Sequence, residues 1–181
     1  MPDTDHLSDS FLAAVALANV FGSGFAQGRA RPEGDEAGVV ASLRLTTRRV
    51  PEIDLPTFAE GGRELYGVLR LLVDDDVDAA ADGVNAMLER TMATPRLVRE
   101  GDQPWHLHFA GTGVSVAIGW LAEFATAVAR VIGNDASRLR GCEAERCDNL
   151  FLDSTRSRTQ RYCSTACQNR TKVAAHRARR P

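Results

Sequence analysis

The C-terminal stretch GCEAERCDNLFLDSTRSRTQRYCSTACQNRTKVAAHRARRP, residues 141–181, decides how this chain is organised. It holds all four cysteines of the 181-residue protein, in the spacing C-x4-C-x15-C-x3-C. Two close cysteine pairs separated by a short stretch are typical of a tetrahedral structural zinc site, because each pair supplies one edge of the tetrahedron. The predicted ligands of one structural Zn²⁺ are Cys142, Cys147, Cys163 and Cys167.

Two alternatives for these cysteines are reduced thiols without a metal and a redox switch. Zinc is favoured because a stretch of about 40 residues with few apolar side chains is below the size that usually folds unaided. A structural zinc contributes roughly 10 to 16 kcal/mol of apparent folding free energy to small modules. The stretch therefore predicts a small module that folds around its metal.

The local pattern in this stretch predicts a knuckle, a hairpin and a helix, as in treble-clef zinc modules. Residues 149–153 favour a strand, residues 154–160 a turn, and residues 161–163 a return strand. The helix is expected to start at Ser164 or Thr165. Cysteines four residues apart in its first turn face the same way, so both can reach one ion.

Charge is distributed unevenly along the chain. Residues 1–137 carry 11 arginines against 20 acidic residues, a formal charge of −9, whereas residues 138–181 carry 11 basic residues against four acidic ones, a charge of +7. Such asymmetry favours a polyanion as the partner of the basic part. The candidate nucleic-acid-binding residues are Arg156, Arg158, Arg161, Arg170, Lys172, Arg177, Arg179 and Arg180. The alternatives are a solvated basic face, or one that packs on the acidic body of the same molecule.

The first 137 residues predict a mainly helical body. Apolar residues recur at three- and four-residue spacing over residues 114–132, with Glu123 and Arg130 off the apolar face, which is the pattern of an amphipathic helix. Three more helices are expected at residues 10–21, 56–74 and 77–92.

The rest of the body predicts less regular structure. Residues 96–100 and 105–110 are alternating runs on either side of a turn, and they favour two short strands. Residues 22–38 favour a loop, and residues 38–47 suit a strand or a helix. The predicted fold class is α+β: a mainly helical N-terminal domain with a small antiparallel sheet, followed by a C-terminal treble-clef-like zinc finger.

His106 and His108 form an H-x-H pair in the body. They stand two residues apart on a predicted strand, so their rings share a face, and such a pair can chelate a metal. Because the sequence shows no third ligand, a solvent-facing strand is the favoured interpretation, and the metal site stays the alternative.

The segments CEAERC and LFLDSTRSRTQRYCSTACQNRTKVAAHRARR resemble the CGNR zinc-finger family of bacterial proteins. In that family the finger follows an N-terminal domain called ABATE, for which a role in stress-induced transcription regulation has been suggested. The resemblance implies an ABATE-like domain at residues 1–137 and a CGNR-type finger at residues 138–181. The family's ligands carry over to the four cysteines, and Asn169 and Arg170 match the Asn-Arg of its name. Gln168 replaces the family's glycine, and the last cysteine pair is one residue closer together.

The expected function is DNA binding by the finger of a transcription regulator, and not catalysis. The partners expected are duplex DNA, a second copy of the chain in a homodimer, and a small-molecule effector sensed by the body. The competing class is a protein-interaction module, and a weaker third is an enzyme with a pocket near His106 and His108. The first apolar run, residues 11–21, follows acidic residues and is too short to span a bilayer, so the sequence predicts a cytoplasmic protein without a membrane partner.

Overall fold

The computed structural model describes residues 3–47, 49–99, 101 and 105–179. Its helices are α1 (Asp3–Gly22), α2 (Glu36–Leu43), α3 (Leu55–Val73), α4 (Val77–Arg90), α5 (Val116–Asn134) and α6 (Thr165–Arg177). Its strands are β1 (Phe25–Ala26), β2 (Arg29–Ala30), β3 (Arg96–Val98), β4 (His106–His108), β5 (Leu139–Gly141) and β6 (Leu150–Leu152). The strands pair into antiparallel hairpins β1–β2, β3–β4 and β5–β6.

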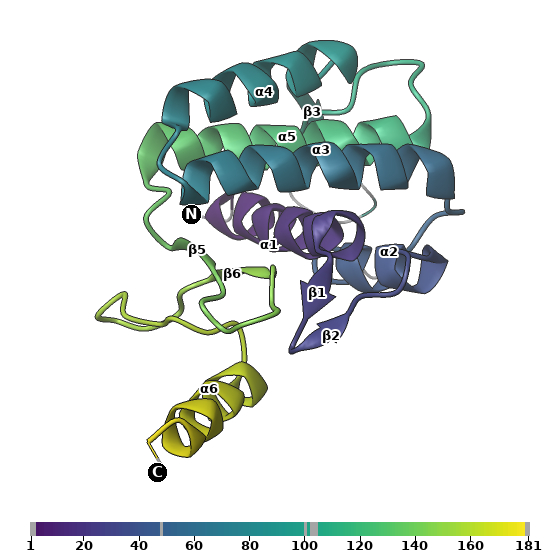
Figure 1. Cartoon of the computed structure of the whole chain (residues 1–181). Helices are drawn as coiled ribbons and strands as arrows, with labels where there is room; N and C mark the ends of the chain where they lie inside the picture. Colours follow the sequence, from purple (N-terminus) through teal and green to yellow (C-terminus); the bar gives the residue numbers. More distant parts are fainter. Residues whose placement is uncertain (1–2, 48, 100, 102–104, 180–181) are drawn as a thin grey trace.

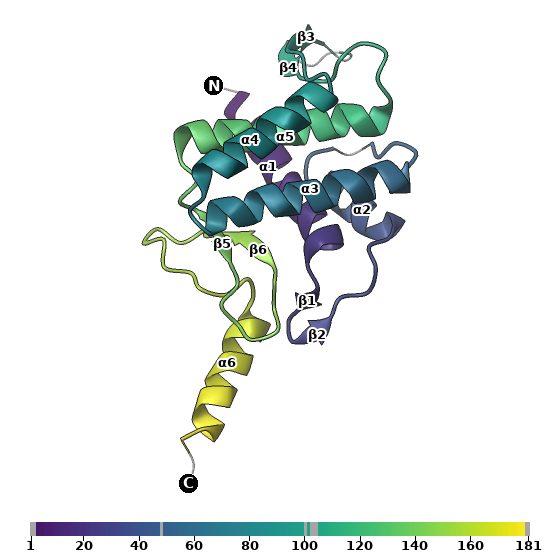
Figure 2. The ribbon, with the colours of Figure 1, turned by 45° about the horizontal axis from the view of Figure 1, so that its top comes forward.

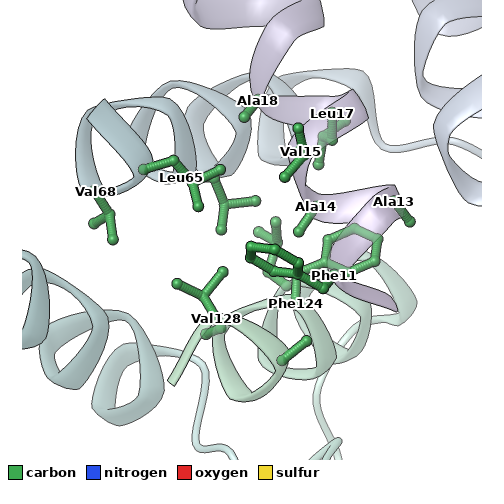
Figure 3. Packing of buried hydrophobic residues seen from close by; sticks show 14 of the residues in the cluster. Phe11, Ala13, Ala14, Val15, Leu17, Ala18, Leu65, Val68, Phe124 and Val128 are labelled. Atoms are coloured by element: carbon green, nitrogen blue, oxygen red, sulfur yellow. The ribbon is translucent and has the colours of Figure 1, made fainter. Parts of the chain in front are cut away.

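The body is a helical bundle in which α1 packs against α2, α3 and α5, and α4 packs against α3 and α5 (Figure 1). Its centre is apolar, and Phe11, Leu65 and Phe124 from three different helices meet there (Figure 3). Helix α5 is long and apolar enough to cross a membrane by length and composition, but half of it is buried inside the protein. A core helix of a folded domain has the same composition.

The helix starts follow from side chains that cap free backbone N–H groups. Asp54 accepts from the Thr57 N–H at 3.3 Å, and Asp76 accepts from the Ala79 N–H at 3.2 Å. Such capping by Asp is favourable and adds to the attraction of an acid for the helix dipole. The helices predicted at residues 10–21, 56–74, 77–92 and 114–132 are confirmed.

Glu123 is the main correction to the predicted helix pattern. The sequence placed this residue off the apolar face of α5, but its side chain is only 5% exposed. It is buried because the β3–β4 hairpin covers it, and its Oε1 accepts a hydrogen bond from the Phe109 N–H at 2.6 Å. The periodicity of one helix does not show which polar residue another segment will cover.

The segment between α1 and α3 holds more regular structure than the sequence suggested. Residues 22–38, predicted as a loop, contain the β1–β2 hairpin, whose turn is formed by Gln27 and Gly28 with positive φ angles of 52° and 90°. Residues 38–47, left open between strand and helix, belong largely to α2, and Asp35 caps it.

The predicted hairpin around residues 96–110 is confirmed as β3–β4, with Leu97 opposite Leu107. Glu100 and residues 102–104, which include part of its predicted turn, lie outside the described residues. His106 and His108 are half-buried, with 33% of the His108 side chain exposed. The hairpin lies at the opposite end of the molecule from α6 (Figure 2).

The hairpin predicted between the two cysteine pairs is wrong in its pairing. Strand β6 forms as expected, but its partner is β5, on the far side of the first cysteine pair. Residues 161–163 form no strand, because they make isolated hydrogen bonds to the first cysteine pair and its knuckle instead of pairing with β6. The Glu143 N–H donates to the Arg161 carbonyl at 3.0 Å, and the Cys163 N–H donates to Cys142 Sγ at 3.4 Å.

Strands β5 and β6 belong to the core of the body. Leu139 and Leu150 are at most 5% exposed and lie in the same apolar cluster as α1, α3 and α5. The side chain of Asn19 on α1 also pairs with β6 as a neighbouring strand would. Its Oδ1 accepts from the Leu150 N–H and its Nδ2 donates to the Leu150 carbonyl, both at 2.8 Å.

Asn19→Ala is therefore expected to lower the free energy of unfolding by about 1–3 kcal/mol, because it leaves two backbone groups of Leu150 without their partners. Denaturant unfolding of zinc-loaded protein measures this. Asn85→Ala, at an exposed position on α4, is the matched control and should change little. Equal stability of the two variants would show that the Asn19 hydrogen bonds do not contribute to the free energy of unfolding.

Candidate metal centre and nucleic-acid interface

The four cysteine sulfurs form one compact group, with every pair of Sγ atoms within 4.8 Å. The Cys147 and Cys163 sulfurs are 3.7 Å apart, and the Cys163 and Cys167 sulfurs are 3.8 Å apart. Zn–S bonds of about 2.3 Å at tetrahedral angles put sulfurs about 3.8 Å apart. These separations are far too long for a disulfide. The cysteines therefore hold one structural Zn²⁺.

Burial and contact between neighbouring sulfurs shift the pKa values of the cysteine thiols. Burial raises the pKa of Cys163, and the neighbouring Cys142 and Cys147 raise it further. Burial also raises the pKa of Cys147, but N–H groups of Gln27 and Asn149 donate to its sulfur and lower the pKa overall. A divalent ion deprotonates coordinating thiols outright, so metal binding converts the four thiols to thiolates, whose negative charge the ion offsets in part.

Local structure brings the second cysteine pair together at the start of α6. Ser164 is the N-cap residue, and its Oγ accepts from the Cys167 N–H at 3.3 Å. The sequence placed both cysteines in a helical turn, but Cys163 precedes the cap and only Cys167 is helical. The extended backbone of Ser164 turns Cys163 back toward its partner, which replaces the expected helical spacing. The start predicted at Ser164 or Thr165 is confirmed.

The first cysteine pair lies on a knuckle between β5 and β6. Arg146 takes a positive φ of 52° there, and Ala144 is buried beneath the turn. The Cys142 N–H donates to the Asn149 carbonyl at 2.9 Å, which closes the knuckle. The chain thus presents two sulfurs from a tight turn, as a zinc knuckle does.

The β1–β2 hairpin of the body lies against this knuckle (Figure 1). The Asp148 N–H donates to the Phe25 carbonyl at 2.9 Å, and the Phe25 N–H donates to Asp148 Oδ2 at 2.7 Å. The Gln27 N–H lies 3.4 Å from Cys147 Sγ, and the Gly28 N–H donates to the Arg146 carbonyl at 2.9 Å. A segment distant in sequence therefore contributes a hydrogen bond to a zinc ligand.

Residues 138–180 match the model of the CGNR zinc finger family. The match covers the knuckle, the loop after it and α6, and it agrees with the resemblance seen in the sequence. A search of curated proteins gives no match. The ABATE-like assignment of residues 1–137 and the domain boundary at residue 138 stay predictions.

A loop links the two halves of the CGNR finger, and Asp153 organises it. Its carboxylate accepts from the Thr155 N–H and the Gln160 N–H, both at 2.8 Å. Burial raises the pKa of Asp153, but these donors and the Thr155 hydroxyl outweigh it, and the pKa is lowered overall. The charged carboxylate therefore holds the loop that displays Arg156 and Arg158.

Two of the candidate cations on this part of the finger are engaged within the protein. Arg158 Nη2 lies 2.9 Å from Asp135 Oδ2 at the end of α5, and Arg158 also donates to Ser137. Arg161 Nε donates to Glu143 at 2.6 Å, and this pairing raises the pKa of Arg161. Both pairs are exposed, so they hold the side chains only weakly.

Arg170 is held more firmly. Its guanidinium donates to the Glu145 carbonyl on the knuckle and lies directly over Gly28, where a Cβ would overlap it. Arg170 therefore joins α6, the knuckle and the β1–β2 hairpin. Arg170 therefore fits the alternative prediction, in which the basic face packs on the body of the same molecule.

The remaining cations point to solvent. Among the described residues, Arg156, Lys172 and Arg177 are exposed and form no ion pair, and Arg179 donates only to the Ala175 carbonyl. Arg180 lies outside the described residues. The structure divides the described candidates into anchored and free side chains.

Sequence reasoning missed Asn149, which links the body to the finger. Its Oδ1 accepts from Arg31 at 2.8 Å and from Ser23 at 3.2 Å, while its Nδ2 lies 3.8 Å from Cys163 Sγ. Its position two residues after Cys147 was the only available signal.

Proposed function

We propose that the protein is a DNA-binding transcription regulator whose CGNR finger contacts duplex DNA through α6. The observation that supports this proposal is the exposed position of α6. The helix projects from the rest of the molecule (Figure 2), and apart from Cys167 its described residues are exposed or half-buried. No acidic residue follows Asp153 in the sequence.

Contact with the DNA backbone is supported by the charge of the finger. Residues 138–181 carry a formal charge of +7, and a zinc ion held by four thiolates contributes −2, which leaves +5. Each phosphate that a cation neutralises releases condensed counterions from DNA, which drives binding. Stacking on single-stranded bases is disfavoured because Phe151 is buried and Tyr162 is half-buried.

The anchoring of Arg170 tells which face of α6 is available. Lys172 lies about 160° around the helix axis from Arg170, since an α-helix has 3.6 residues per turn. Arg179 lies just beyond the end of α6, which is at Arg177. A duplex groove at this outer face would meet Lys172, with the exposed Arg177 and Arg179 near the end of the helix.

The proposal extends to the fold type of the finger and to the role of the body. The finger is of treble-clef type in that its ligands come from a knuckle and a helix start. The body serves ligand sensing or dimerisation in a cytoplasmic, bacterial, stress-responsive regulator, and it is not an enzyme. The second candidate function is a protein-interaction module, which the free cations favour if the partner is acidic.

Lys172→Ala combined with Arg177→Ala is expected to weaken duplex binding on all sequences. The slope of log affinity against log salt should become shallower by about 0.9 for each phosphate contact removed. Fluorescence anisotropy of zinc-loaded protein with genomic duplexes over a salt series measures it.

Arg63→Ala, at an exposed position on α3, is the matched control and should leave the slope unchanged. Undetectable duplex binding by zinc-loaded protein at low salt would sink the regulator proposal. In that case, release of an acidic protein partner by the double substitution would support the interaction module.

A further inference from the structure

His106 and His108 place two imidazole nitrogens unusually close together. Their Nε2 atoms are 3.0 Å apart, and their rings are tilted by 57° at a centroid distance of 4.9 Å. Both rings project from the same face of β4, which pairs with β3 over its full length. Backbone pairing with β3 therefore fixes the face of the hairpin from which both rings project.

The nitrogen separation fits two ligands of one metal ion. Imidazole nitrogens bind zinc at about 2.0–2.1 Å, so two of them at right angles lie about 2.9 Å apart, and two at a tetrahedral angle about 3.4 Å apart. The observed 3.0 Å falls within this interval, close to the right-angle value. A direct N–H···N hydrogen bond is the competing account of the same distance.

A buried carboxyl group stands behind the pair. Glu123 Oε1 lies 3.6 Å from His108 Nδ1, on the side of the ring away from the paired nitrogen. Its Oε2 is buried and forms no hydrogen bond with any described residue. Burial raises the pKa of Glu123, although the Phe109 N–H and His106 partly offset this. The site therefore holds an acid whose charged form needs a nearby cation.

This arrangement is the one that orients metal-binding histidines. A carboxylate next to the second ring nitrogen sets the tautomer of the imidazole and makes the first nitrogen a better ligand. Two imidazoles favour zinc, copper, nickel and related ions over magnesium or calcium, which prefer oxygen. Both rings are half-buried, so water can complete the coordination shell from the open side.

We infer that His106 and His108 form a second metal site, which binds one divalent transition-metal ion through their Nε2 atoms, with Glu123 as the residue that positions His108. The site is separate from the zinc finger, because β4 and α6 lie at opposite ends of the molecule (Figure 2). It gives the body a ligand of its own, whatever the finger binds.

The test uses the full chain with its finger zinc in place and Ni²⁺ as the probe. Equilibrium dialysis followed by metal analysis should find one Ni²⁺ bound per chain in addition to the zinc. His106→Ala and His108→Ala should abolish this binding, and Glu123→Gln should weaken it about 10- to 100-fold. His176→Ala, which removes an exposed histidine at the end of α6, is the matched control and should bind as the unmodified protein does.

Three results would overturn the inference. They are no retained Ni²⁺, Ni²⁺ uptake matched by loss of zinc from the finger, and equal loss of binding in His176→Ala. Circular dichroism and zinc content of each variant are compared with those of the unmodified protein, and a second readout covers a variant that does not fold. In the unmodified protein, paramagnetic Ni²⁺ should broaden the His106 and His108 imidazole resonances before that of His176. Unchanged spectra would support the N–H···N hydrogen bond instead.

Discussion

Cys147→Ser is expected to lose zinc and to unfold the knuckle, the loop after β6 and α6. A structural zinc contributes roughly 10 to 16 kcal/mol of apparent folding free energy in small modules. Within the part of the chain that the structure describes, the finger's own cluster contains only Ala144 and Tyr162 apart from the cysteines, so no apolar core replaces the lost metal. Metal analysis and amide hydrogen exchange measure the change, and Cys163→Ser should behave in the same way.

Loss of zinc should reach into the body, but only as far as the β1–β2 hairpin. The amides of Phe25 and Gly28 donate to the knuckle, so they should lose protection together with the Asp148 amide. Helices α3 to α5 should keep theirs, because Leu65 and Phe124 pack independently of the metal. Zinc returned to chelator-treated protein should restore protection. Full protection at Gly28 without metal would contradict the coupling.

Leu150→Ala is expected to destabilise the whole protein by about 2–5 kcal/mol, the usual cost of truncating a fully buried leucine. Leu150 is 2% exposed and packs in the body core, although it lies between the two cysteine pairs. Denaturant unfolding of zinc-loaded protein, followed through the helical signal of the body, measures this change.

Val173→Ala provides the matched control, since Val173 is an apolar finger residue that is 49% exposed on α6. It should shift stability by no more than about 0.5 kcal/mol. If Leu150→Ala behaves like Val173→Ala, the finger strands do not belong to the core of the body.

The helices and the metal ligands could be predicted from the sequence because both depend on local spacing. The periodic spacing of apolar residues around Phe124 and the capping position of Asp76 predict helices without reference to distant residues. The cysteine pairs likewise carry their geometry within a few residues. Grouping Cys142 with Cys167 needed only the assumption that the chain between them could turn back.

Features that depend on a distant partner could not be predicted. β6 is a short run of three apolar residues, and nothing in its sequence distinguishes β5 from residues 161–163 as its partner. Asn19 resembles any polar residue of an amphipathic helix until β6 lies beside it. Arg170 and Arg177 are both basic residues of one predicted helix, and the sequence does not show that Arg170 packs over Gly28 of the β1–β2 hairpin.

The contact between the β1–β2 hairpin and the knuckle also decides which segments must be transferred to place the finger on another protein. A fragment cut at residue 138 would leave Leu139 and Leu150 without their cover, and the Cys147 sulfur without the Gln27 donor. A chimera that carries α6 to a new host would therefore need the segment from Asn19 to Arg31 as well. Any transferable form of the finger must therefore include two stretches of chain that lie more than a hundred residues apart.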